Sequence, residues 1–306
     1  MNPSKRSKGC VELDTFEELV GTIHAKGGPV EADYPDLLAA LHDVAGLLWA
    51  DPARRDDVDR VLEACGPAFE PDTMQGFAWR KPLGYAGDFV AIDKFHTNAR
   101  HPDPVLGRWD AFSQAQPGAA AVRNRARYLW RLVEGLEEEY GRPIHVLNVA
   151  CGPCRDVLGY YEGHPNSGTR FDCIDLDSRA LDHAREICGA QDGRVTYECA
   201  DARRYDGAVR YDLIWSAGLF DYFPAEVFSN VLRHLGGLLA PGGRIVLGNF
   251  CSTDPNRAYM DVLDWHLHRR SASVLRRLAD AAGFRSDAVH VEREPLGVNL
   301  FLHVRT

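Results

Sequence analysis

The chain has 306 residues, 45% of them hydrophobic and 26% charged, which is typical of a globular protein with one large domain or one domain and a sizeable extension. Its formal net charge of -9 argues against a nucleic-acid partner, because a polyanion normally needs a basic surface. No apolar run approaches a membrane span, and the N-terminus lacks a secretory apolar core. We therefore expect a cytoplasmic protein without a membrane partner.

The N-terminal part, residues 1–116, is predicted to be a helical cap with a lid loop. Residues 1 to about 10 are polar, and we expect them to be disordered. Apolar residues at helical spacing predict three helices, at Val11–Ala25, Tyr34–Trp49 and Arg54–Cys65. The next stretch, Gly66 to Pro104, is rich in glycine, proline and aromatic residues. Such a segment is typical of a lid or binding loop, or of a wrapping loop whose aromatic side chains fill a hydrophobic seam.

A long helix is predicted from Pro117 to Tyr140, because proline is favoured in the first helical turn. Arg123, Arg127 and Arg131 recur every four residues along it and form a basic stripe. A solvated face is the usual reason for such a stripe. Arg123 differs from the other two because it lies near the helix start, the end that could face a substrate.

The rest of the chain is organised around the stretch from Ile144 to Asp156. It reads as an apolar strand, a tight small-residue turn at Ala150–Pro153 and the start of a helix. At such a junction backbone N–H groups point outward, so a ligand can lie against the main chain where the side chains are small. A second strand, Phe171–Ile174, ends in Asp175, about 20 residues beyond the loop, where nucleoside-binding folds place an acid for the ribose hydroxyls.

The same loop distinguishes between two nucleoside cofactors. The nicotinamide fingerprint needs a small residue at its sixth position, where this chain has Arg155. S-adenosylmethionine carries no phosphate and needs only close approach of its methionine part to the main chain, which the Ala-Cys-Gly sequence permits. The loop therefore favours S-adenosylmethionine.

Further strands and helices follow in the order of an open α/β sheet. Val195–Glu198 leads to Asp201 and Ala202, an acid beside a small residue, suited to an adenine amino group. The remaining predicted elements are a strand at Tyr211–Ser216, a helix end, turn and strand over Leu238–Leu247, helices at Ser178–Ile187, Asn256–Arg270 and Ser273–Ala282, and a terminal hairpin of Asp287–Glu292 and Val298–Val304. Asp177 is predicted to cap the helix that follows it.

These segments together resemble the class I S-adenosylmethionine-dependent methyltransferases. The resemblance is carried by NVACGPC, CIDLD, ADA, YDLIWSAGLFDYF and LLAPGGRIVLGNF, and it covers about Pro143 to Val304. It implies an α/β, Rossmann-like fold with a seven-stranded mixed sheet of order 3-2-1-4-5-7-6 flanked by helices, at residues 117–306 after the N-terminal cap. Cys154 departs from the pattern, since many members have a third glycine there.

Two sets of site residues are expected. The cofactor is expected to bind Ala150, Cys151, Gly152, Asp175, Leu176, Asp201, Ala202, Ser216 and Asp88. The catalytic set for the acceptor is expected to be Tyr85, Arg123, Tyr222 and His266. For a carboxylate acceptor, Arg123 would be the anchor and Tyr85 a donor. For an amine acceptor, Asp88 or Asp221 would be the charge partner and His266 the base.

Three functions are compatible with these motifs. Methyl transfer from a sulfonium is an in-line displacement that depends on positioning, and a carboxylate is already an anion at neutral pH whereas an amine or phenol must lose a proton. We predict methyl-ester formation on a small-molecule carboxylate. The alternatives are N- or O-methylation of an amine or phenol of a secondary metabolite, and a non-catalytic methyltransferase-like regulatory subunit.

A closer resemblance narrows the expected acceptor. The pieces KPLGYAGDF, AVRNRARYL and DWHLHRRS are similar to those of a bacterial group that includes enzymes making 3-hydroxypalmitic acid methyl ester. A nucleic-acid acceptor is disfavoured, because Ser216–Leu219 lacks the proline-aromatic motif that holds a flipped base. A homodimer is compatible with the sequence.

The 8 cysteines are scattered along the chain and are expected to be reduced thiols. Cys151 and Cys154 form a C-x-x-C pair. A zinc site would need a second pair, which the later sequence lacks, and a redox pair would need an exposed helix start. We therefore expect no metal and assign both cysteines as small residues that let the loop approach the cofactor.

Overall fold

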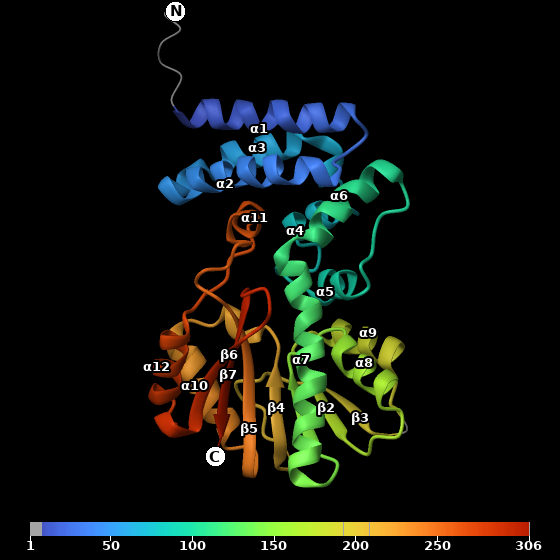
Figure 1. Cartoon of the computed structure of the whole chain (residues 1–306), viewed down its shortest axis with the longest axis vertical. Helices are drawn as coiled ribbons and strands as arrows, with labels where there is room; N and C mark the ends of the chain where they lie inside the picture. Colours follow the sequence, from blue (N-terminus) through green and yellow to red (C-terminus); the bar gives the residue numbers. More distant parts are fainter. Residues whose placement is uncertain (1–7, 192, 208, 306) are drawn as a thin grey trace, which may run out of the picture. The chain divides into compact units, whose positions relative to one another are not determined.

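The computed structural model describes residues 8–191, 193–207 and 209–305, and its contacts divide the chain into two compact units (Figure 1). The first unit contains the residues up to Ala120 together with Pro255–His266. The second contains Ala121–Asp254 and the residues from Leu267 onward. The predicted disorder of residues 1–10 lies outside the described residues up to residue 7, and the first helix already begins at Lys8.

The first unit is helical. Its helices are α1 (Lys8–Ala25), α2 (Tyr34–Ala50), α3 (Arg55–Ala64), α4 (Met74–Arg80), α5 (Phe89–His96), α6 (Pro104–Ala115), the start of α7 (Pro117–Tyr140) and α11 (Arg257–Val262). The three helices predicted for the cap are confirmed. Side chains of α1, α2 and α6 meet in an apolar core that includes Phe16, Leu37 and Phe112, and Tyr259 of α11 lies edge-on to Phe112 in the same core.

Two predictions for this unit are wrong in their secondary structure. The segment Gly66–Pro104, predicted as a loop, contains α4 and α5, and each begins at a side-chain cap: Thr73 accepts from the Gly76 N–H and Asp88 from the N–H groups that follow it. The helix predicted at Asn256–Arg270 ends at Val262, and Asp264 has a left-handed φ of 54°. Aspartate is one of the few residues that tolerate this conformation, which stops a helix.

The second unit contains one seven-stranded sheet of order β3-β2-β1-β4-β5-β7-β6 (Figure 1). The strands are β1 (His145–Val149), β2 (Arg170–Asp175), β3 (Val195–Cys199), β4 (Tyr211–Ser216), β5 (Leu239–Phe250), β6 (Val289–Arg293) and β7 (Asn299–Arg305). The first five pair in parallel, and β7 is antiparallel to both of its neighbours. The predicted fold class and strand order are confirmed.

Helices cover both faces of this sheet. They are α7, α8 (Arg155–Gly163) and α9 (Ser178–Cys188) on one face, and α10 (Ala225–Gly236) and α12 (Ala272–Ala281) on the other. The neighbours Val146 and Leu147 of β1 belong to the two opposite cores. Burial on both faces explains why the central strands are almost continuously apolar. Asp177 caps α9 by accepting from the Arg179 N–H, as predicted.

The turn predicted before the fifth strand is wrong, because β5 runs without interruption through Pro241 and Gly242. Tyr211 pairs with Leu239, but Leu213 already pairs with Arg244, so β5 contributes extra residues at this point. Such an irregularity lets a strand accommodate a turn-like sequence while pairing resumes beyond it. Gly242, with a φ of 78°, supplies the left-handed residue that the irregularity needs.

Candidate functional site

The loop between β1 and α8 has an unusual backbone. Ala150, Gly152 and Cys154 all have φ near the left-handed region, at 53°, 54° and 54°. For residues other than glycine this conformation costs of order 1–3 kcal/mol and is typical of functional sites. Apart from the two neighbouring residues in the chain, no heavy atom of the described residues lies within 4 Å of the position that a Cβ of Gly152 would take. The main chain at Gly152 therefore borders open space in which a ligand can lie.

Asp175, at the end of β2, is bonded directly to this loop. Its Oδ2 accepts a hydrogen bond of 2.9 Å from the Gly152 N–H, and its Oδ1 accepts one of 2.9 Å from the Asp177 N–H. Burial raises the pKa of the Asp175 carboxyl, and the two N–H donors oppose that rise. The acid predicted to bind ribose is therefore held in a fixed orientation beside the open loop.

An exposed apolar side chain follows Asp175. Leu176 is 68% exposed, which is unusual for a leucine beside a buried strand end. A large apolar side chain next to a ribose-type acid suits the face of a purine ring. Ala202, the small residue predicted to lie near the adenine, is buried in the core of the second unit. The residues present thus fit a nucleoside cofactor at this edge of the sheet.

Asp201, predicted to bind the adenine amino group, is paired with a neighbour. Both of its carboxylate oxygens accept from the Arg203 guanidinium, at 2.6–3.0 Å, and Oδ1 also accepts from the Arg203 N–H. This arginine lowers the pKa of Asp201. An adenine amino group would have to share these oxygens with Arg203.

Ser216 is the last residue of β4, which lies beside β1 at the position where the strand order reverses. Its buried hydroxyl donates to the Val149 carbonyl at 3.0 Å, so the side chain ties the ends of the two strands together. In open α/β sheets, ligands bind outside the carboxyl ends of the strands at this switch point. The loop, Asp175 and Ser216 therefore share the edge at which a cofactor is expected.

Sequence reasoning missed a buried arginine at this edge. Arg125 of α7 is 7% exposed, and its Nη1 donates to the Ala217 carbonyl at 3.1 Å, directly after β4. A Cβ on Gly218 would stand 3.0 Å from the same nitrogen, so glycine leaves room for the guanidinium. Within the described residues the buried Nε of Arg125 has no hydrogen-bond partner. The sequence does place Arg125 on an apolar helix face, because it follows Val122 by three residues. Both side chains are buried.

A buried polar network surrounds Asp221 in η4 (Leu219–Tyr222). Asp221 is 1% exposed, and its Oδ1 accepts from Asn249 Nδ2 at 2.9 Å and from the Phe250 N–H at 2.6 Å. Arg270 donates to the Phe220 carbonyl and to Asn249 Oδ1, at 2.9 and 2.7 Å. Burial raises the pKa of Asp221 to about 7, against the opposing effects of the Phe250 N–H and of Arg125 and Arg270. This carboxyl group is enclosed and already bonded.

The residues predicted for the acceptor are divided between the units. Tyr222, 41% exposed, and half-buried Arg123 belong to the second unit, and burial lowers the pKa of Arg123 with a further contribution from Arg127. Tyr85, Asp88 and His266 belong to the first unit.

Two of the first-unit residues have local partners. Asp88 Oδ1 accepts from the Val90 and Ala91 N–H groups at 3.0 Å and thereby caps α5. His266 Nε2 lies 2.8 Å from Asp264 Oδ1. The roles predicted for these residues in cofactor and acceptor binding stay predictions.

Comparisons with known proteins agree with this geometry. A family model described as a methyltransferase domain matches residues 146–243, from β1 into β5. That range contains the loop, Asp175, Asp201 and Ser216. No curated protein matches the chain.

Solved structures share the fold at low identity. A possible exported protein from Bordetella parapertussis has 19% identity and a TM-score of 0.60, over 100% of this chain and 99% of that chain. The S-adenosylmethionine-dependent methyltransferase SibL, in its apo form, has 17% identity and a TM-score of 0.50, over 97% of this chain and 95% of that chain. At these identities the similarity shows the fold alone.

The strand order and the open loop at the switch point define a class I methyltransferase fold. Residues 146–243 therefore form a methyltransferase domain, and the open main chain at Gly152 with Asp175 beside it fits S-adenosylmethionine as the cofactor. Within the described residues no helix is long and apolar enough to cross a membrane.

Proposed function

We propose that this enzyme methylates the carboxylate of a small molecule and forms a methyl ester. The observation that carries the proposal is Arg125, a buried guanidinium beside the residues that follow β4, whose Nε has no hydrogen-bond partner in the described part of the chain. Arg123 lies two residues earlier on the same helix. Guanidinium groups are the preferred partners of carboxylates, because their N–H groups form paired, charge-assisted hydrogen bonds.

The chemistry suits such a site. Bound S-adenosylmethionine supplies a methyl group activated on a sulfonium. An acceptor carboxylate, with a pKa of about 4, is ionised at neutral pH and needs no base. Its oxygen would therefore accept the methyl group without any side chain having to remove a proton. The chain's own residues have to orient the acceptor and exclude water, a positioning effect that can contribute about 7–11 kcal/mol.

The buried network supports a carboxylate over an amine. Asp221, the second-unit residue predicted to pair with an amine, is 1% exposed and accepts hydrogen bonds from Asn249 and Phe250. At 1% exposure it offers an ammonium group almost no accessible surface. An anionic acceptor could instead pair with Arg125, whose guanidinium lies beside the residues that follow β4.

The proposal extends to the acceptor class and the location. The segments around Tyr85, Arg123 and His266 resemble the group that makes 3-hydroxypalmitic acid methyl ester, so a 3-hydroxy fatty acid is the first acceptor to test. We also infer a cytoplasmic location, since reduced thiols persist there. The described cysteines are free thiols, at positions 65, 151, 154, 173, 188, 199 and 251.

A labelled-methyl assay tests the acceptor. The enzyme is incubated with methyl-labelled S-adenosylmethionine and chain-length-matched sets of 3-hydroxy acids, amines and phenols, and the products are identified by mass spectrometry. We expect label in acids only, and its release by mild alkali, because methyl esters hydrolyse where N-methyl groups and aryl ethers do not. Alkali-stable label in an amine or phenol would contradict the proposal. Calorimetric binding of S-adenosylhomocysteine without transfer to any acceptor would favour a regulatory subunit.

A further inference from the structure

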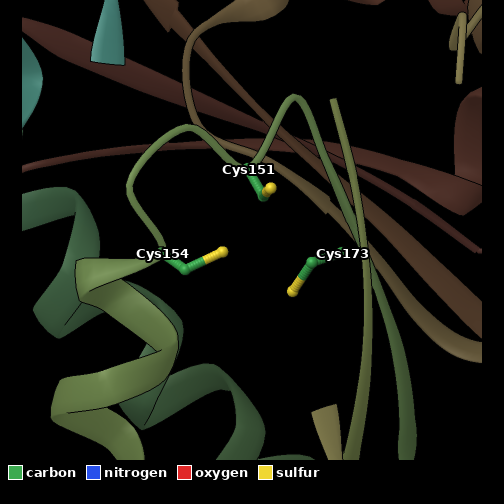
Figure 2. Close-up of side chains that lie close together, drawn as sticks. All are labelled: Cys151, Cys154 and Cys173. Atoms are coloured by element: carbon green, nitrogen blue, oxygen red, sulfur yellow. The ribbon is translucent and has the colours of Figure 1, made fainter. Parts of the chain in front are cut away.

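Three buried cysteines gather beneath the cofactor loop. Cys151 lies in the loop, Cys154 directly precedes α8, and Cys173 lies on β2. Their exposures are 7%, 0% and 0%. The three sulfur atoms all lie within 4.8 Å of one another, and Figure 2 shows the side chains pointing into the same small space.

Cys173 is the member that pattern reasoning left out. The sequence itself shows only the C-x-x-C pair, without a second pair further along the chain. The third sulfur instead comes from the neighbouring strand, because Asn148 of β1 pairs with Cys173 of β2 and the loop folds back over that strand. The Cys151 N–H donates to the Ile174 carbonyl at 3.1 Å and holds this arrangement.

We propose that Cys151, Cys154 and Cys173 form a binding site for one thiophilic cation, with Cu⁺ as the ion that fits best. Thiolates are soft ligands that select Cu⁺ and Zn²⁺ over the harder ions bound by oxygen. Zinc in structural sites takes four protein ligands, whereas Cu⁺ is satisfied by three sulfur atoms. The group of potential ligands within the described residues has these three members.

The geometry requires little movement. A metal–sulfur distance of about 2.3 Å in a planar three-fold site places the sulfur atoms about 4 Å apart. From separations of at most 4.8 Å, small side-chain rotations suffice. Each thiol that coordinates releases its proton to solvent and the ion keeps its charge, so binding needs no oxidant or reductant.

An ion in this site would join three elements that hold the cofactor loop. It would connect the loop at Cys151, the start of α8 at Cys154 and β2 two residues before Asp175. Because Gly152, next to Cys151, donates to Asp175, the cross-link would restrict the conformation that faces the cofactor. The inference does not depend on which acceptor is methylated.

Competition with a chromophoric ligand tests the site. The full-length reduced chain is titrated anaerobically into Cu⁺ complexed with bicinchoninate, and copper transfer is followed by loss of colour. We expect the wild type to extract one equivalent, and Cys154→Ser and Cys173→Ser to bind at least about 100-fold more weakly. Cys199→Ser, which alters an exposed cysteine outside the cluster, is the matched control and should bind like the wild type.

The proposal is overturned if the wild type extracts no more copper than the Cys151→Ser/Cys154→Ser/Cys173→Ser triple variant, or if Cys173→Ser binds as tightly as the wild type. X-ray absorption of the copper-loaded wild type should show three sulfur neighbours, and a two-sulfur site would reject the three-cysteine assignment. If a serine variant does not fold, alkylation of the wild type in partially denaturing urea replaces it. Copper should then protect residues 151, 154 and 173 but not Cys199, and equal labelling with and without copper would reject the site.

Discussion

The cofactor loop and the Arg125–Asp221 network lie at the same edge of the sheet but are built differently. The loop presents main chain and one acid to open space at Gly152. The network consists of charged side chains that are buried, and most of their polar atoms are bonded to the protein. The difference shows that the loop is shaped to receive a ligand, whereas the network mainly fixes the segment after β4. Four experiments can separate the two roles.

The largest effect is expected from pH acting on Asp221. Its pKa of about 7 in the folded protein lies above the ordinary aspartate value, so the folded state keeps a proton that the unfolded state loses near pH 4. The stability that this group contributes is therefore fully present below pH 4 and is lost as pH rises through 7, by of order 4 kcal/mol. Denaturant unfolding of wild type and Asp221→Asn between pH 4 and 8 measures it.

As pH rises from 4 to 8, the free energy of unfolding of the wild type should fall relative to that of Asp221→Asn. A constant difference would mean that Arg125 and Arg270 keep the carboxyl ionised throughout. The network would then be a set of ion pairs and not a protonated acid between two cations.

On the loop side, Gly152→Val should abolish cofactor binding almost completely. Valine at this position must adopt a φ of 54°, which is unfavourable for a β-branched residue. Its side chain also fills the open space. We expect S-adenosylhomocysteine to bind at least about 100-fold more weakly, a loss of about 2.7 kcal/mol, by calorimetry. Gly135→Ala, at an exposed helical position with nothing within 4 Å, is the control, and similar affinities for the two variants would show that no ligand lies against Gly152.

Asp175→Ala should weaken the same binding by about 10-fold or more, because charge-assisted hydrogen bonds to the ribose are lost. Asp182→Ala, which removes an exposed carboxylate paired with Arg185, should leave the affinity unchanged. An unaltered dissociation constant for Asp175→Ala would refute the ribose assignment and leave Asp175 as a residue that only orients Gly152.

The smallest effect is expected at Arg123. Arg123→Ala should raise KM for the carboxylate acceptor several-fold, about 1 kcal/mol, while the affinity for S-adenosylhomocysteine stays the same. Arg127→Ala changes an exposed arginine one turn later and serves as the control. Steady-state kinetics of both variants decide the matter, since equal KM values would remove Arg123 from the acceptor site.

The sequence predicted what depends on local pattern. The strands around Ile144–Asp156, the helix at Pro117–Tyr140 and the cap at Asp177 follow from periodicity and from residues a few positions apart. The strand order came from the resemblance, because pairing across the sheet is not visible in periodicity.

The features that sequence patterns did not reveal depend on contacts between distant segments. Cys173 meets Cys151 and Cys154 only once β2 pairs with β1. Asp221 is enclosed by residues of β5 and by Arg270, far along the chain. The turn predicted at Pro241–Gly242 lies in the irregular stretch of β5, between Leu239 and Arg244, where the register with β4 shifts.

The outer strand β6 has a consequence for how the molecule behaves in concentrated solution. It pairs with β7 alone, and it places His290, Glu292 and Arg293 at exposed positions. Charged side chains along an unpaired border discourage a second chain from adding its own strand there. The β6 border is thereby disfavoured as a place where a second copy of the chain could extend the sheet.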